Sequence, residues 1–339
     1  MLIRSVVLGL AFASLGLPQA ADPKPKDATR GILEAFDTFE VVGMHSAHGG
    51  KDVDDFILSL IRDPQFAAKV NDIVVECGNS RYQPLLDRYI AGEDVSLKEV
   101  QPVWRDTTQL MCSLSAFYAE LFPLVRAINQ KRPANERLRV LAGDPAFDWA
   151  TVTSRSDVPI GDRDFTIASV MKTEVLSRKR KALMLFGLMH LLHGLPASPP
   201  AEERTMRATA VTMYEQSYPG LTFVVIPHRG FGTFSHLEAD NTMLEARLKS
   251  WPEPSLVPLK GTWLGDLGAA YFFEVPASWR QRPVSSLADA YLYLGPLDSL
   301  HAEPASAEIR HDDAFMSELL RRKAIGGTSF SAFDPAAIR

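Results

Sequence analysis

Short apolar runs alternate with segments of helical period along most of the chain, and this alternation constrains the fold more than any other feature. The strand-length runs are FEVVGM, NDIVVECG, ERLRVLAGD, RKALMLFGLMH, LTFVVIP and LADAYLYLG. Nearly continuous apolar strands separated by helices indicate a mainly parallel sheet that is covered by helices on both faces. We therefore predict an α/β fold.

The segments between these runs carry signals for helices. In DVDDFILSLIRD, apolar residues recur every three or four positions from Val53 to Leu60, so they line one face of a helix. SRYQPLLDRYIAG follows the next strand and ends at Gly92, a residue that typically stops a helix. A longer helical region at about 100–132 is predicted to be an insertion between the second and third strands. We expect residues 38–339 to form one α/β domain.

The N-terminal residues resemble a secretory signal peptide. MLIR supplies one positive charge, SVVLGLAFASLGL is apolar but too short to span a bilayer comfortably, and ADPKPKDA is polar. We predict a signal peptide at 1–21, a linker at 22–37 and a periplasmic or secreted mature chain; the alternative is a retained membrane anchor. No later stretch of the sequence is long and apolar enough to form a transmembrane span.

The net charge argues against a nucleic-acid partner, and the cysteine count limits the chain to at most one disulfide. With a net charge of −5 and a pI near 5.9, the chain lacks the excess of Lys and Arg that a nucleic-acid partner requires. Export would place the chain in an oxidising compartment, yet Cys77 and Cys112 are the only cysteines. One disulfide and two buried free thiols remain equal alternatives.

Polar residues follow several of the predicted strands. Of the eight histidines, four lie in HSAHGG and HLLHG, each directly after an apolar run. The residues at or just past the carboxyl ends of strands are His45, His48, Glu76, Asn79, Asp144, His190 and His193. Ligands of parallel sheets bind outside these strand ends. We therefore predict that the histidine pairs and Glu76 belong to one site.

Two kinds of chemistry fit these residue types. Imidazole and carboxylate groups are standard ligands for a divalent metal such as Zn or Mn, and we name His48, Glu76 and His190 as candidate ligands. Alternatively, a histidine takes a proton from water directly, oriented by a carboxylate. Two histidines three positions apart have both rings on one side of a helix, but in a loop this spacing does not determine where the rings lie.

Each carboxylate near the predicted site has a structural role as the alternative to a functional one. Glu76 ends the apolar run DIVVE, where a buried carboxylate needs a hydrogen-bond donor, a metal or a cation. The structural alternative to a catalytic role is a buried acid paired with Arg81 or another cation. Asp144 in AGDP is either a ligand or an Asx-type turn before a proline, and Asp289 in LADAYLYL is more consistent with a structural role. Residues expected around the substrate are His45, Ser46, Asn79, Arg81, Asp144 and Asp289.

Four stretches together resemble the erythromycin esterase/Tiki/ChaN superfamily. These are VVGMHSAHGGKDVDDFILSLIRDPQF, DIVVECGNSRYQPLLDRYIAGE, RVLAGDP and RKALMLFGLMHLLHG, and LADAYLYLG resembles a later strand of the group. The resemblance implies an α/β fold with a mainly parallel sheet, built from two related halves that each end a strand with a histidine motif. Members include macrolide esterases, metal-dependent peptidases and haem-binding uptake proteins, so the resemblance by itself does not select one reaction.

The resemblance also assigns residues. It makes His48 the histidine of the first motif and Glu76 the strand-end glutamate, and GLMH supplies His190 as the second motif. His193 resembles the second histidine of a pair found in the esterase branch. In the first motif, His45 and Ser46 stand where the family has Gly and Glu.

The resemblance favours an exported hydrolase that cleaves an ester or amide bond of a small-molecule or peptide substrate. In this interpretation His48 is the general base, Glu76 orients the water or shares a metal, and His190 and His193 stabilise the oxyanion or complete a metal site.

The alternative from another class is a haem- or metal-binding protein of the ChaN type without turnover. Haem requires an axial ligand such as His or Tyr, and His45, His193 and Tyr82 are the candidates. Because the first motif departs from the family pattern, a non-catalytic scaffold is a third interpretation.

Overall fold

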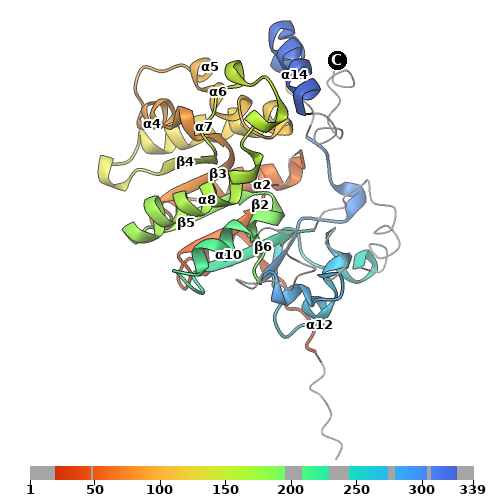
Figure 1. Ribbon diagram of the computed structural model, residues 1–339. Coiled ribbons are helices and arrows are strands. Elements are labelled where there is room, and N and C mark those ends of the chain that lie inside the picture. The colour runs from red at the N-terminus through yellow and green to blue at the C-terminus, as the bar shows by residue number, and fades with distance from the viewer. Residues whose placement is uncertain are drawn as a thin grey trace, which may run out of the picture.

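The computed structural model describes residues 20–46, 49–194, 208–228, 244–273, 279–303 and 307–326 (Figure 1). Nearly all of the predicted signal peptide lies outside the described residues, and so does His48. Within the described ranges, no helix combines the length and the apolar character needed to cross a membrane.

The described residues form one eight-stranded sheet in the order β1-β7-β8-β6-β2-β5-β3-β4. The strands are β1 (Lys26–Asp27), β2 (Val41–His45), β3 (Asp72–Asn79), β4 (Arg139–Asp144), β5 (Ala182–Phe186), β6 (Thr222–Pro227), β7 (Ser255–Pro258) and β8 (Ala290–Tyr293). From β8 to β4 all neighbouring strands are parallel, whereas β7 and β1 pair antiparallel at one edge. The predicted mainly parallel α/β sheet is therefore confirmed.

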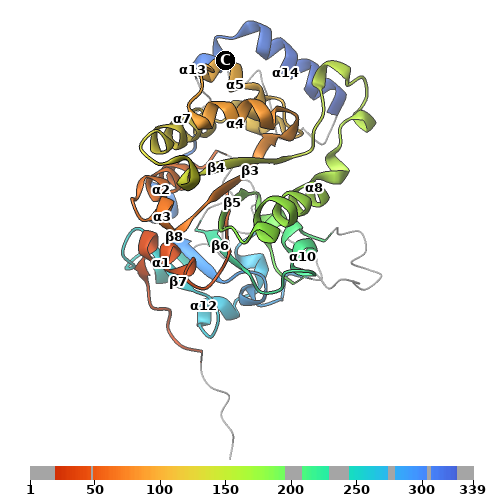
Figure 2. The ribbon, with the colours of Figure 1, turned by 90° about the vertical axis from the view of Figure 1, so that its left-hand side faces the viewer.

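Helices cover both faces of the sheet. One face is packed by α1 (Ala28–Ala35), α2 (Lys51–Arg62), α3 (Phe66–Lys69), α4 (Gln83–Ala91), α5 (Leu97–Val100), α6 (Pro102–Arg105) and α7 (Phe117–Asn129). The other is packed by α8 (Arg163–Val170), α9 (Leu188–Leu191), α10 (Ala210–Glu215) and α12 (Trp263–Asp266). Figure 2 shows this division, with α2 and α3 on one side of the strands and α8 and α10 on the other. A third apolar cluster joins α13 (Ala307–Arg310) and α14 (Asp313–Gly326) to the 3₁₀ helix η2 (Leu110–Leu114).

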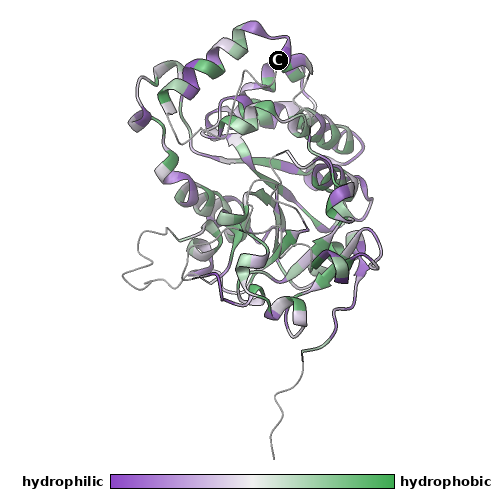
Figure 3. Cartoon of the chain, turned by 90° about the vertical axis from the view of Figure 1, so that its right-hand side faces the viewer, coloured by the Kyte–Doolittle hydropathy of each residue, from purple (hydrophilic) through white to green (hydrophobic). Residues whose placement is uncertain are grey.

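The strands are buried on both faces, which explains their nearly continuous apolar sequences. All eight residues of β3 and all five of β5 are buried, and the strands at the centre of Figure 3 are mostly hydrophobic. Because successive side chains of a strand point to opposite faces, Val75 and Cys77 pack with α2 and α7, whereas Val74 packs with α8. Gly92 ends α4 with a φ of 95°, as predicted.

Two strands were not predicted from the sequence. β7 has four residues and β1 has two, and both lie at the antiparallel edge of the sheet. Segments this short give no periodicity that separates a strand from a loop.

The strand order brings the predicted site residues to one edge. β2, β5, β3 and β4 are consecutive and parallel. His45 and Asp144 end β2 and β4, and Glu76 lies in the second half of β3. Gly187 follows β5 and precedes α9, which contains His190.

Candidate functional site

A buried arginine joins two of the predicted carboxylates. The guanidinium of Arg163, in the first turn of α8, is hydrogen-bonded to Glu76 Oε1 through Nη2 and lies 3.1 Å from Asp144 Oδ1 through Nε. The side chains are 6%, 2% and 0% exposed, respectively. Burial alone lowers the pKa of Arg163, but the charges of Glu76 and Asp144 outweigh this effect and hold that pKa above its ordinary value.

Asp144 has further donors from the helical insertion. The backbone N–H of Thr108 donates to Oδ2 at 2.6 Å and its hydroxyl donates to Oδ1 at 2.7 Å. Burial raises the pKa of Asp144, while Arg163 and Thr108 oppose part of that rise. Asp144 therefore links the insertion to α8 and does not stand as a simple turn residue before Pro145.

His190 lies between this buried cluster and a second carboxylate. Its Nδ1 is 2.8 Å from Asp164 Oδ1, and its Nε2 is 3.1 Å from Arg163 Nη1 and 3.6 Å from Glu76 Oε1. A guanidinium has only donors, so Nε2 must accept and the proton of a neutral ring must lie on Nδ1, facing Asp164. Asp164 Oδ1 also accepts from the backbone N–H of Ala210 at 2.9 Å, which fixes the carboxylate.

A backbone hydrogen bond and one glycine place His190 beside Glu76. The backbone N–H of Gly187, at the end of β5, donates to Glu76 Oε2. α9 then folds over β2, where a Cβ on Gly43 would approach the side chain of Leu191 to 3.0 Å. A side chain at position 43 would press against α9, so glycine at this position helps to hold His190 where it is.

His193 contacts a different set of side chains. Because α9 ends at Leu191 and Leu192 is extended, the two histidines do not continue along one helix face. His193 Nε2 is 2.9 Å from Asp289 Oδ2, and Nδ1 is 3.3 Å from Glu215 Oε2. Burial lowers the pKa of His193, but hydrogen bonds with these two carboxylates raise it to about 9.

The residues at the end of β2 are buried. His45 and Ser46 are 5% and 4% exposed, and the Ser46 N–H donates to the carbonyl of Phe186 at 2.9 Å, which extends the pairing of β2 with β5. His48, the predicted base, lies outside the described residues.

Asn79 and Arg81 bond to residues in the connections that follow α6 and β4. The Asn79 amide donates to the carbonyls of Asp106 and Phe147 at 2.8 and 3.0 Å. Arg81 pairs with Asp148 at 3.1 Å on the surface. The guanidinium beside Glu76 belongs to Arg163 and not to Arg81, so the structural alternative holds with another cation as the partner.

The sequence did not single out Arg163, Asp164 or Thr108. Arg163 and Asp164 open a helix in GDRDFT, where charged residues are ordinary. Their role appears only when α8 packs against β3, β4 and α9.

The described donors do not suit a divalent metal. Within the described ranges, no three His, Cys, Asp or Glu side chains are grouped so as to hold an ion. Of the predicted ligands, Glu76 and His190 are bridged by the guanidinium of Arg163, which already supplies positive charge between them.

The candidate haem ligands do not share a site either. Tyr82 donates to Asp106 at 2.9 Å, His193 bonds to two carboxylates, and His45 is buried at the end of β2.

Cys77 and Cys112 form a disulfide, with their Cα atoms 5.5 Å apart. This resolves the alternatives that the sequence left open. The crosslink ties β3, one residue after Glu76, to η2 in the helical insertion.

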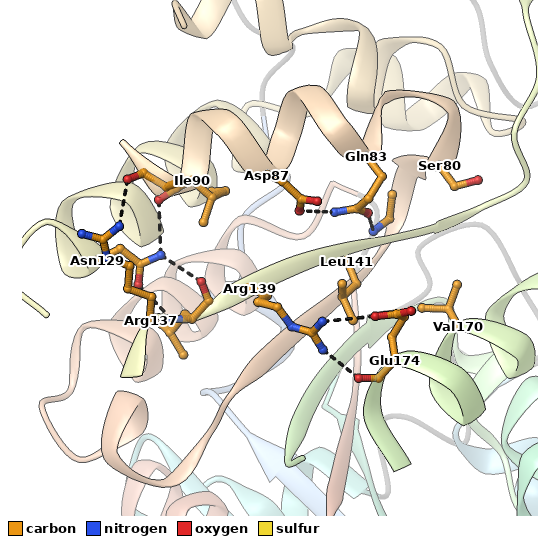
Figure 4. A pocket seen from close by; sticks show the side chains of 13 residues that line it. Ser80, Gln83, Asp87, Ile90, Asn129, Arg137, Arg139, Leu141, Val170 and Glu174 are labelled. Atoms are coloured by element: carbon orange, nitrogen blue, oxygen red, sulfur yellow. Dashed lines mark hydrogen bonds and ion pairs between the residues drawn. The ribbon is translucent and has the colours of Figure 1, made fainter. Parts of the chain in front are cut away.

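A cavity of about 480 Å³ beside β4 is separate from these residues (Figure 4). β4 is an edge strand, and the Gln83 side-chain amide bonds to the carbonyl of Val140 at 2.9 Å and the N–H of Ala142 at 2.7 Å. The Asn129 amide bonds in the same way to both backbone groups of Leu138. These amides occupy the outer edge of the strand, which protects it from pairing with another chain.

No protein-family model and no curated protein sequence matches the chain. It aligns with the crystal structure of a Bacillus cereus protein at a TM-score of 0.52 and 10% identity, covering 84% of this chain and 97% of the other. It also aligns with a histidine-to-asparagine mutant of the erythromycin esterase EreC in its open conformation, at a TM-score of 0.51 and 9% identity, covering 82% and 94%. At such identities the likeness establishes the fold alone, and that fold is erythromycin esterase-like, as the sequence resemblance predicted.

Proposed function

We propose that this erythromycin esterase-like fold serves an exported hydrolase that cleaves an ester or amide bond of a small-molecule or peptide substrate. The observation that carries the proposal is the arrangement of His190: Asp164 orients one ring nitrogen at 2.8 Å, and the other faces Arg163 at 3.1 Å. A histidine with its unprotonated nitrogen next to a fixed cationic donor combines a base with an electrostatic stabiliser.

The proposed reaction uses His190 Nε2 as the base. In the resting site, Arg163 Nη1 donates to that nitrogen. A substrate carbonyl that takes over this donor frees Nε2 to accept a proton from water. The water oxygen bonds to the carbonyl carbon, and the carbonyl electron pair moves onto oxygen beside the guanidinium. Collapse of this intermediate breaks the C–O or C–N bond, and the leaving group takes the proton from Nε2.

Glu76 and Asp144 have a supporting role in this proposal. Together they hold Arg163 in place while remaining buried. Because Glu76 is one half of a buried ion pair, its removal would disturb both stability and catalysis. Variants of Glu76 are therefore poor tests of chemistry.

Asp164→Asn is the sharper variant. Asp164 Oδ1 accepts from both His190 Nδ1 and the Ala210 N–H, so an asparagine oxygen in that place keeps both bonds and the tautomer. The variant removes the negative charge that stabilises the imidazolium formed when Nε2 takes the proton. We expect kcat/KM for aryl esters or aryl amides to fall by roughly 10²- to 10⁴-fold, with the thermal midpoint nearly unchanged. His190→Asn should lose activity to a similar extent.

His193→Gln is the matched control, because it removes a histidine three residues away that bonds to other carboxylates. It should retain turnover within a few-fold. His48→Ala tests the assignment based on the family resemblance: a loss as large as that of His190→Asn would make His48 a second essential group. Wild-type turnover in His190→Asn would refute the proposal.

A further inference from the structure

A short segment at residues 105–108, which joins α6 to η2, carries Thr108 into the buried cluster. The N–H and the hydroxyl of Thr108 donate to Asp144, whose Oδ1 also accepts from Arg163 Nε at 3.1 Å. Arg163 Nη1 in turn lies 3.1 Å from His190 Nε2. Because Thr108 and Asp144 are each 1% exposed, little water is available to replace these bonds. The position of Thr108 therefore affects the guanidinium that faces His190.

The C-terminal helix α14 holds this segment through one buried arginine. Arg322 is 4% exposed, and its Nη1 donates to the carbonyl of Arg105 at 2.7 Å while its Nη2 donates to Asp106 Oδ1 at 2.7 Å. Its Nε donates to Glu318 Oε1, also at 2.7 Å, one turn earlier in α14. A planar guanidinium with bonds in three fixed directions is held in one orientation. Arg322 thus fixes both the backbone and a side chain of the 105–108 segment.

Three consecutive carbonyls of this segment accept from side chains of three different elements. The donors are Arg322 of α14 for residue 105, Asn79 at the end of β3 for residue 106 and Trp149 Nε1 of the 3₁₀ helix η4 (Trp149–Thr151) for residue 107, at 2.7, 2.8 and 3.1 Å. The next residue, Thr108, gives its N–H to Asp144. A connection outside any helix or strand is therefore anchored along its whole length.

The attachment of α14 to the protein does not account for this arginine. Met316 and Leu319 of α14 are 1% and 0% exposed and belong to the third apolar cluster, so the helix already packs through apolar side chains. A buried ion pair typically contributes no more stability than apolar side chains of the same volume. The buried guanidinium is better explained by the placement of the 105–108 segment.

We propose that Arg322 is a positioning residue for the reaction at His190. It holds the 105–108 segment so that Thr108 fixes Asp144, and Asp144 in turn fixes Arg163. This inference rests on the function proposed above. Since Arg163 acts on charge that develops only in the transition state, a misplaced guanidinium should lower kcat more than it raises KM.

Arg322→Met and its neighbour Arg321→Met form a matched pair for steady-state kinetics with an aryl ester. Arg321 also bonds to Glu318, but its other bonds run to the carbonyls of Trp149 and Val152. At a temperature where circular dichroism shows both variants folded, Arg322→Met should lower kcat by about 10- to 100-fold with KM within about threefold. Arg321→Met should keep kcat within about twofold of wild type. Equal kcat for Arg322→Met and wild type would overturn the proposal.

A double-mutant cycle tests whether Arg322 acts through Thr108. Thr108→Val keeps the shape of the side chain and removes its hydroxyl bond to Asp144, and Thr108→Ser should restore most of the lost kcat because it returns that bond. The double variant Arg322→Met/Thr108→Val should have a kcat close to that of the slower single variant. Two reductions that simply multiply would show independent effects and would refute the route through Thr108.

Nuclear magnetic resonance of the Arg163 Nε–H gives a measurement that does not depend on turnover. The signal is assigned by its loss in Arg163→Lys, and this N–H donates to Asp144. Its exchange with water should become about tenfold faster or more in Arg322→Met and remain as in wild type in Arg321→Met. Should Arg322→Met not fold, Arg322→Lys takes its place, because it keeps the positive charge beside Asp106 but lacks the planar fork.

The two measurements separate the possible failures. A wild-type protein that hydrolyses no ester or amide removes the proposed function, while a changed Arg163 signal in the Arg322 variant still supports the positioning of the guanidinium. Turnover that depends on His190 but not on Arg322, with an unchanged Arg163 signal, would leave the proposed function standing and refute this inference alone.

Discussion

Replacement of Arg163 by methionine should test how the buried cluster is held together. Methionine keeps an unbranched side chain of similar length but removes the guanidinium that contacts Glu76, Asp144 and His190. The arginine side chain is only 6% exposed and the two carboxylates are 2% and 0% exposed. Little water is therefore available to solvate the acids that remain.

The expected cost is large because two buried acids lose the guanidinium that contacts both of them. Removal of one partner of a buried ion pair typically costs about 3–5 kcal/mol, and Asp144 would retain only its two hydrogen bonds from Thr108. A surface pair gives the comparison: Arg81 is 50% exposed and pairs with Asp148, and Arg81→Met should cost about 0–1 kcal/mol.

The loss should also depend on pH, with a definite sign. Burial already raises the pKa of Asp144, and Arg163 opposes that rise, so the variant should raise this pKa further. A carboxyl group whose folded pKa exceeds its unfolded pKa favours folding fully below the unfolded value, and that contribution is lost as pH rises through the folded value. The deficit of the variant relative to wild type should thus be greater at pH 8 than at pH 5, by about 1.4 kcal/mol for each unit of pKa.

Urea unfolding followed by circular dichroism at pH 5, 6.5 and 8 would measure this deficit. The double variant Arg163→Met/Glu76→Gln should recover part of the stability, because one buried charge is removed with its partner. A deficit below about 1 kcal/mol at pH 8, or one that is the same at pH 5, would refute the reasoning.

Three other expectations concern separate parts of the molecule. His193→Gln should lower the free energy of unfolding at pH 7 by roughly 1–3 kcal/mol, since bonds with Asp289 and Glu215 raise the pKa of His193 to about 9. This stabilisation is complete below the ordinary pKa of histidine and is lost as pH rises through about 9. An equal loss of stability at about pH 10 would contradict the ion-pair account. Replacement of Cys77 and Cys112 by serine opens a loop with a sequence separation of 35 and should cost about 3–4 kcal/mol; a reductant should produce the same loss in wild type and none in the variant. If the predicted signal peptide is cleaved, N-terminal sequencing of the exported protein should begin shortly after residue 20, whereas Met1 recovered from a cytoplasmic fraction would reject export.

The sequence determined the class of fold because its main signal is local. Buried parallel strands require nearly continuous apolar runs, and their covering helices require a period near 3.6, so both can be read within a few residues. Glu76 could be identified for a similar reason, since a carboxylate in a buried strand stands out from its neighbours. The short antiparallel strand β7 carried no such signal.

Only the tertiary structure decided which residues meet. Arg163 is 87 positions from Glu76 and 27 from His190, and nothing in the sequence around it distinguishes it from an arginine on a helix surface. His190 and His193 look alike in sequence, yet α9 ends between them and sends their side chains to different carboxylates. Partners of a buried charge are selected by the packing of distant elements, because a charged side chain far from water must be satisfied by whichever opposite charge the fold brings beside it.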